Sequence, residues 1–179
     1  MSPPAAETAA RRGAAPITSL DSLVAAHPGT LSELFVAARP TDPAELGDAP
    51  RGRLLAFAPG AEVFLAFRPL LRALGGGLMP WRGKTFDHGG NSGQNVLLNR
   101  RAFRFQAEVA LSRLDGRPAL ALTYDAPAHG NPWPVSALRD ELRTVGPGVA
   151  IGPAFFLPPG ASAPVALLWF GLESAHRPG

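Results

Sequence analysis

The chain of 179 residues has no cysteine, and it has a single lysine and a single tyrosine. Without cysteine the protein forms no disulfide, and catalysis by a thiolate or metal binding through cysteine is excluded. The four histidines lie far apart in the sequence, at positions 27, 88, 129 and 176. None of them belongs to a pair with the spacing of metal ligands. The sequence therefore predicts neither a metal site nor a bound cofactor.

Charged residues are also scarce, at 17% of the chain, and they form no basic pattern. The only adjacent basic pairs are Arg11-Arg12 and Arg100-Arg101, and no aromatic residues are interleaved with a run of arginines. A nucleic-acid partner is therefore not expected. Glu7 and the first arginine pair interrupt the apolar residues near the N-terminus, so we expect no secretory signal. Because no apolar run reaches the ~20 residues that span a bilayer, we expect a soluble, cytoplasmic protein without a membrane span.

Glycine and proline are abundant, at 20 residues each, and they fall between apolar runs, where turns are expected. An apolar fraction of 46% is typical of a globular protein. We expect a floppy tail over residues 1–16 and a single domain over 17–179. The first part of that domain, residues 17–77, has helical character.

Three helices are predicted within this N-terminal part. A weak helical pattern covers residues 17–26. Thr30 and Glu33 form a capping box, in which each side chain satisfies the backbone N–H of the other residue, and the helix that follows is expected to end at Pro40. Apolar residues at helical spacing predict a third helix over 61–74, before a run of three glycines.

After Gly77 the apolar period changes from helical to two, which is typical of strands. Residues 103–112 alternate between apolar and polar, and Asp115-Gly116 predicts a type I′ turn into a strand over 119–125. Further strands are expected over 53–57, 79–86, 94–98, 137–145, 149–157 and 165–173. Seven or eight antiparallel strands without crossover helices close into a barrel or stack as a sandwich. An eight-stranded barrel has an interior that holds one small ligand.

Several short motifs in this part of the chain follow one another in a recognisable order. They are Trp81-Arg82-Gly83-Lys84-Thr85-Phe86, Tyr124-Asp125, Arg139-Asp140-Glu141-Leu142-Arg143 and Gly148-Val149-Ala150-Ile151-Gly152. Their order resembles that of bacterial calycin-like, lipocalin-type barrels, in particular the GXWXG/DUF4334-type proteins, over residues 30–173. Arg51-Gly52-Arg53 stands where that family has its Gly-x-Trp-x-Gly box. The resemblance implies a mainly β fold: an antiparallel calycin-type barrel with two or three short N-terminal helices, shaped as a cup for an apolar molecule.

Lys84 is the most informative residue, because the other sixteen basic side chains are arginine. Strand alternation places it on one face with Arg82 and Phe86, and Trp81 on the other. A lysine desolvated among aromatic residues has a lowered pKa and serves as a base, a Schiff-base amine or an anchor for a ligand carboxylate. The alternatives are a structural ion pair at one end of the barrel and a solvated side chain.

Asp140 is a carboxylate on the apolar face of the strand predicted over 137–145, where it is costly unless paired. Three residues are candidate partners: Lys84, Arg104 and Tyr124. The opposite face of the strand is expected to carry an exposed charge ladder of Arg139, Glu141 and Arg143. Tyr124 is the only tyrosine beside ten phenylalanines, which indicates a role for its hydroxyl. We therefore name Lys84, Tyr124 and Asp140 as candidate catalytic residues, the alternative for Asp140 being a satisfied structural carboxylate.

The remaining candidates are residues that would line a ligand site. They are Trp81, Phe86, Phe103, Arg104, Phe105, His129, Trp133 and Trp169. Trp133 belongs to a proline-rich loop, 125–134, that is expected to fold over the mouth of the barrel, and an ordinary exposed histidine is the favoured interpretation of His129. The glycine-rich segment 87–93 lacks the helix and the lysine of a phosphate-binding loop, so it is interpreted as a hairpin connection.

The leading hypothesis from these residues is the binding of a small lipophilic molecule inside a β-barrel. The alternative is an isomerase, cyclase or hydratase that acts on a polyketide- or terpenoid-like substrate through the three candidate catalytic residues. A structural or partner-binding module is a third class. The sequence leaves the oligomeric state open.

Overall fold

The computed structural model describes residues 17–59 and 81–175, and it shows a closed, eight-stranded antiparallel β-barrel with few short helices. The barrel strands are β2 (Arg51–Phe57), β3 (Trp81–Phe86), β4 (Ser92–Leu97), β5 (Arg100–Leu111), β6 (Pro118–Thr123), β7 (Leu138–Gly146), β8 (Val149–Phe156) and β9 (Val165–Glu173). The short strand β1 (Arg39–Pro40) pairs with the end of β7, at Arg143 and Thr144, beyond the residues of β7 that pair with β6. The prediction of a mainly β fold, an antiparallel barrel of seven or eight strands with short helices, is therefore confirmed.

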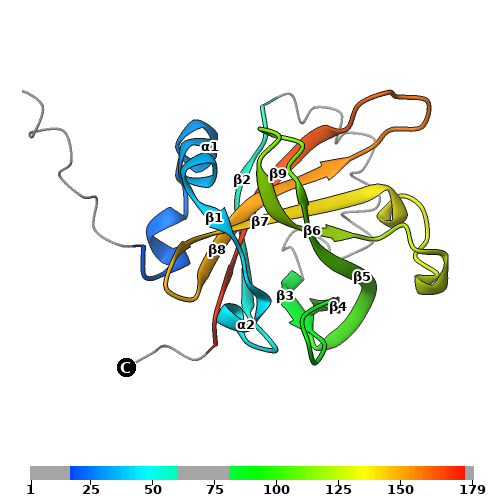
Figure 1. Ribbon diagram of the computed structural model, residues 1–179, viewed down its shortest axis with the longest axis horizontal. Coiled ribbons are helices and arrows are strands. Elements are labelled where there is room, and N and C mark those ends of the chain that lie inside the picture. The colour runs from blue at the N-terminus through cyan, green and yellow to red at the C-terminus, as the bar shows by residue number, and fades with distance from the viewer. Residues whose placement is uncertain (1–16, 60–80, 176–179) are drawn as a thin grey trace, which may run out of the picture.

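The strand order runs β7-β6-β5-β4-β3-β2-β9-β8, and pairing of β8 with β7 closes the barrel (Figure 1). The pairing of β2 with β3 is the shortest of these pairings, with the single register pair Arg51 and Gly83. Gly83 has a φ of +140°, and a Cβ atom there would collide with the carbonyl oxygen of Pro50. Glycine at this position therefore lets β2 and β3 approach closely enough to close the barrel.

Short helices complete the described part of the chain. They are the 3₁₀ turns η1 (Leu20–Leu23), η3 (Pro127–His129) and η4 (Val135–Ala137), and the α-helices α1 (Pro28–Ala37) and α2 (Pro43–Leu46). None of the helices that the structure describes is long and apolar enough to cross a membrane. The tail predicted over 1–16 and the helix predicted over 61–74 lie outside the described residues.

Two apolar clusters lie on opposite faces of the barrel wall. The first, the barrel core, fills the barrel and includes Phe86, Phe105, Leu120, Leu122, Tyr124, Leu142, Phe170 and Leu172. The outer cluster lies where η1 and α1 pack on the outside of the barrel, and it includes Leu20, Leu31, Phe35, Ile151 and Trp169. Each large apolar side chain that is fully buried contributes about 1.5–3 kcal/mol to the stability of the fold. The barrel is thus stabilised from within and by one helical cover (Figure 1).

The N-terminal helices begin at positions other than those predicted. The segment expected to be a weak helix over 17–26 forms only the 3₁₀ turn η1. The helix predicted to begin at the capping box of Thr30 and Glu33 starts earlier, at Pro28, because the His27 side chain caps it by accepting a hydrogen bond from the Gly29 N–H. Proline is favoured at the first helical position, where its missing N–H costs nothing.

The hairpin between β5 and β6 is longer than predicted. Its turn spans residues 112–117, closed by a hydrogen bond from the Ser112 N–H to the Arg117 carbonyl. Gly116 has a φ of +69°, whereas Asp115 lacks the positive φ that a type I′ turn requires at both central residues. The Asp115 side chain instead forms an ion pair with Arg143, which fixes this longer turn.

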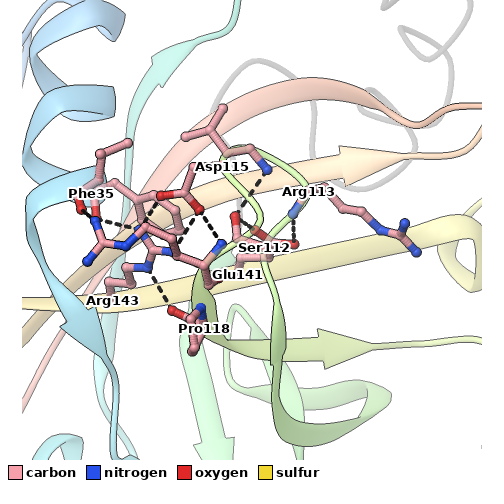
Figure 2. Close-up of polar contacts among 10 residues, drawn as sticks. Phe35, Ser112, Arg113, Asp115, Pro118, Glu141 and Arg143 are labelled. Carbon is pink, nitrogen blue, oxygen red and sulfur yellow. Dashed lines mark hydrogen bonds and ion pairs between the residues drawn. The ribbon is translucent and has the colours of Figure 1, made fainter.

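The charge ladder expected on the outside of β7 is not exposed. Glu141 and Arg143 are both 0% exposed. All five N–H groups of Arg143 donate hydrogen bonds: to both oxygens of Asp115 and to the carbonyls of Phe35, Arg117 and Pro118 (Figure 2). Glu141 accepts hydrogen bonds from the Ser112 hydroxyl, the Arg113 N–H and the Arg139 side chain. Because α1 and the β5–β6 turn cover this face, Glu141 and Arg143 are buried. Arg143 connects β7 with α1 and with the turn.

Candidate functional site

Lys84, Tyr124 and Asp140 meet inside the barrel, where they form one polar cluster with Asn95. The Lys84 Nζ atom lies 2.7 Å from Tyr124 Oη, 2.7 Å from Asp140 Oδ2 and 2.9 Å from Asn95 Oδ1. The Tyr124 hydroxyl donates to Asp140 Oδ2 at 2.7 Å. We call these four residues the inner cluster. They come from four different strands or strand ends, so only the closed barrel brings them together.

A bulge on β3 decides which side chains join Lys84 on the inside. The register of β3 against β4 shifts between Trp81 and Gly83, which breaks the alternation that the sequence predicts. Trp81 therefore lies on the same side as Lys84, and its indole N–H donates to Asn95 Oδ1 at 3.0 Å. Arg82, predicted to share the face of Lys84, is exposed.

A second bulge, between β4 and β5, positions Asn95. The register shifts between Gln94 and Asn95, opposite Phe103, whose φ of +54° is unusual for a residue with a side chain. The Phe103 carbonyl accepts a hydrogen bond from Asn95 Nδ2 at 3.3 Å. Such backbone strain costs about 1–3 kcal/mol and occurs more often at functional sites than elsewhere.

Aromatic rings surround the ammonium group of Lys84. Its Nζ atom lies between 5.1 and 5.7 Å from the ring centres of Trp81, Phe105, Tyr124 and Phe170. Cation–π attraction at a desolvated site contributes about 2 kcal/mol or more. Phe105 also contacts the rings of Phe86 and Tyr124 edge to face, so the aromatic side chains fix one another. The cluster is thus a charged centre in an apolar interior.

Burial shifts the pKa values of two members of the inner cluster. Desolvation lowers the pKa of Lys84 below its usual 10.5, and the charge of Asp140 together with its hydrogen bond offsets part of this effect. Desolvation raises the pKa of Tyr124 well above 10.0, and the negative charge of Asp140 acts in the same direction. Tyr124 therefore stays protonated over the whole neutral range and acts as a hydrogen-bond donor rather than as a base.

One end of the barrel interior is sealed and the other is partly exposed. At the end where β3, β5, β7 and β9 begin, four inner-face apolar side chains keep partial exposure: Trp81, Phe103, Leu138 and Leu168. We call this the exposed end. At the opposite end, Leu46 of α2 covers the interior, and Leu120 and Leu172 are also buried. The inner cluster lies beside the partly exposed side chains.

The predicted ligand-site residues divide between the inside and the outside of the barrel. Trp81, Phe103, Phe86 and Phe105 lie on the inner face. Trp169 instead packs edge to face on Phe35 in the outer cluster, with ring centres 5.8 Å apart, and its neighbour Phe170 takes the inner position.

The three other predicted ligand-site residues lie away from the inner cluster. Arg104 is exposed, and its carbonyl accepts a hydrogen bond from Asn131. Trp133 is 63% exposed and contacts the ring of Phe156. His129 is half-buried on η3, and its Nδ1 atom has no hydrogen-bond partner among the described residues.

Asn95 is the member of the inner cluster that sequence analysis did not identify. A signal was present, because asparagine is depleted from strand interiors and Asn95 stands within a predicted strand. Its amide connects four partners: its oxygen accepts from Lys84 and Trp81, and its nitrogen donates to Tyr124 and to the Phe103 carbonyl. No group of three or more histidine, aspartate or glutamate side chains in the described ranges is arranged to hold a metal ion.

The fold is similar to that in the crystal structure of a protein from Thermomonospora curvata. The two align with a TM-score of 0.54 and 16% sequence identity, over 88% of this chain and 93% of that one. At this identity the similarity shows the fold alone. No family model and no curated protein sequence matches the chain. The resemblance to GXWXG/DUF4334-type proteins therefore stays a prediction, and the comparisons support a β-barrel.

Proposed function

We propose that the protein binds a small lipophilic molecule in the exposed end of its barrel, against the inner cluster. The observation that carries this proposal is the contrast between the two ends of the interior. At one end Leu46, Leu120 and Leu172 are buried. At the other end four apolar side chains are partly exposed: Trp81, Phe103, Leu138 and Leu168. Apolar side chains around a few convergent polar groups are typical of small-molecule sites. The predicted resemblance to calycin-type barrels points to the same class of ligand.

Titration with a lipophilic probe tests this proposal. We expect 1-decanol to bind the protein with 1:1 stoichiometry by native mass spectrometry and by calorimetry. Leu168→Arg places a charge among the partly exposed side chains and is expected to weaken binding at least about tenfold, because the arginine removes apolar contact and occupies the site.

Val165→Arg is the matched control for this substitution. It introduces the same side chain on the same strand, at a residue that is already 36% exposed. This variant should bind as the wild type does. Equal weakening by both variants, or binding that neither one changes, would place the ligand elsewhere and contradict the proposal.

An enzyme that acts on such a molecule is the second candidate function. The observation in its favour is the convergence of Lys84, Tyr124 and Asp140 within hydrogen-bond distance, with shifted pKa values at the lysine and the tyrosine. Perturbed groups of this kind occur at catalytic sites and in structural ion pairs alike. In an isomerase, a cyclase or a hydratase, the Asp140 carboxylate would take a proton from the bound molecule, while Lys84 and Tyr124 hold that carboxylate in place.

The two candidates differ in what Asp140→Asn does. For an enzyme, this substitution removes the proton acceptor, so it abolishes conversion of a lipophilic substrate that the folded variant still binds. For a binding protein, no conversion of any candidate substrate is observed with the wild type. Liquid chromatography of the bound molecule before and after incubation with the protein distinguishes them.

A further inference from the structure

The hydrogen-bond donors of the inner cluster are all in use. The three N–H groups of the Lys84 ammonium donate to Asn95 Oδ1, Tyr124 Oη and Asp140 Oδ2. The Tyr124 hydroxyl donates to Asp140 Oδ2, and the indole N–H of Trp81 donates to Asn95 Oδ1. Both hydrogens of Asn95 Nδ2 are also engaged, with Tyr124 Oη and the Phe103 carbonyl. A ligand that enters the site therefore finds no free donor in the cluster.

One acceptor of the cluster remains open. Asn95 Oδ1, Tyr124 Oη and Asp140 Oδ2 each accept two hydrogen bonds. Asp140 Oδ1, in contrast, accepts none from the described part of the chain. The Asp140 side chain is 10% exposed, and Oδ1 is not one of the fully buried polar atoms that lack a partner. Solvent therefore reaches this oxygen. This oxygen is therefore the polar contact that the cluster offers to a ligand.

Charge limits which ligands can use that contact. The positive charge of Lys84 and the negative charge of Asp140 cancel within the ion pair, whose side chains are 1% and 10% exposed. A ligand carboxylate would face Asp140 Oδ1 with a second negative charge and without a donor to accept from. A ligand ammonium would add an uncompensated positive charge to a buried site that already holds Lys84.

We propose that the barrel selects a neutral lipophilic alcohol or phenol, whose hydroxyl donates a hydrogen bond to Asp140 Oδ1. This inference rests on the proposed function and names the ligand class of the same site. The apolar part of the ligand lies on the partly exposed side chains Trp81, Phe103, Leu138 and Leu168, which surround the cluster at the exposed end. Lys84, for which the sequence leaves the roles of base, Schiff-base amine and carboxylate anchor open, orients the acceptor of a ligand hydroxyl in this proposal.

Three probes with the same alkyl chain test this selection: 1-decanol, decanoate and decylammonium. Their dissociation constants are measured with the full-length protein at neutral pH by calorimetry. We expect decanol to bind roughly tenfold to a hundredfold more tightly than either ion, because a hydrogen bond to a charged acceptor is gained and no unpaired charge is buried. The indole N–H signal of Trp81 should shift in the nuclear magnetic resonance spectrum as decanol binds.

Asp140→Asn provides the matching change in the protein. In this variant Lys84 has lost its carboxylate partner, which a bound decanoate can replace, so decanoate should bind at least as tightly as decanol. Asp125→Asn is the control, because it removes the same charge from an exposed residue and should leave the order of affinities unchanged. If Asp140→Asn fails to fold, the affinities of the three probes for the wild type decide the question alone.

The outcomes separate this inference from the function on which it rests. Tighter binding of decanol supports both. Binding of decanoate or decylammonium that equals or exceeds that of decanol overturns the hydroxyl selection and leaves binding of a lipophilic molecule intact. If none of the three probes binds, the proposed function is wrong and the inference falls with it.

Discussion

At the scale of single residues, the environment of Lys84 replaces the water that an exposed ammonium group would have. Three hydrogen bonds and four aromatic rings surround its Nζ atom, and the side chain is 1% exposed. A buried charge is tolerated only with such compensation. Lys84, Tyr124 and Asp140 could be identified from the sequence because two of them are the only residues of their type and the third is a carboxylate on an apolar face.

Tyr124 gives the first prediction, because it is the only tyrosine and its ionisation can be followed alone by ultraviolet absorbance. We expect tyrosinate to appear well above pH 10.0 in the folded protein and near pH 10.0 after unfolding. Above pH 10.0 the unfolded chain loses a proton that the folded protein keeps, so the free energy of unfolding should fall as pH rises through this range.

The Tyr124→Phe variant isolates that effect. Lys84, whose pKa is lowered in the folded state, acts in the opposite direction between its folded pKa and 10.5, where the unfolded chain holds the extra proton and stability rises with pH. This contribution is present in the wild type and in Tyr124→Phe. The free energy of unfolding of the wild type, relative to that of Tyr124→Phe, should therefore decrease above pH 10.0. Formation of tyrosinate near pH 10.0 in the native protein would contradict this prediction, because it would show that Tyr124 is accessible to solvent.

The ion pair of Lys84 with Asp140 gives the second prediction. Lys84→Met leaves the Asp140 carboxylate without its partner in the interior, and we expect it to lower the free energy of unfolding by about 3–5 kcal/mol. The double variant Lys84→Met with Asp140→Leu removes both charges and should be less destabilised than the single variant. Urea denaturation measures both, and a double variant that is less stable than Lys84→Met would contradict this coupling.

At the scale of elements, the strands could be predicted more closely than their connections. The strand predicted over 165–173 coincides with β9, and those predicted over 94–98 and 149–157 differ from β4 and β8 by one or two residues at their ends. Alternating apolar residues specify such strands locally. The bulges at Trp81 and Phe103 depend on how neighbouring strands close the barrel, which no local pattern records.

The end of the β5–β6 hairpin shows a further limit of alternation. Val109 and Leu111 continue the apolar face of Phe105 and Ala107, yet they are 63% and 65% exposed. The pairing of β5 with β4 stops at Gln106, so the rest of β5 has no β4 residue paired to it. Val109 and Leu111 follow the predicted alternation, but they lie beyond the part of β5 that lines the barrel interior.

Arg143 gives the third prediction, at the level of the elements it joins. Arg143→Met removes five hydrogen bonds, among them those to α1 and to the β5–β6 turn, and leaves the Asp115 carboxylate without its ion-pair partner. We expect faster amide hydrogen exchange in α1 and in residues 112–117, and a loss of about 3–5 kcal/mol in the free energy of unfolding. Arg104→Met, at an exposed arginine, serves as the control. Unchanged exchange in both elements would contradict the connecting role of Arg143.

At the scale of the whole molecule, closure of the barrel creates the candidate site. The members of the inner cluster come from β3, β4, the end of β6 and β7, and α2 covers the opposite end of the interior. The barrel and three of the four polar residues could be predicted from the sequence. Which end of the barrel remains exposed could not be predicted, since that depends on α2 and on the bulges.

The most direct test of the account is to measure contacts between a bound lipophilic molecule and the protein by isotope-edited nuclear magnetic resonance. With 1-decanol bound, we expect nuclear Overhauser effects from the alkyl chain to Trp81, Phe103, Leu138 and Leu168. Contacts to Val109 or Leu111 on the β5–β6 hairpin instead, or no contact to the barrel interior, would contradict it.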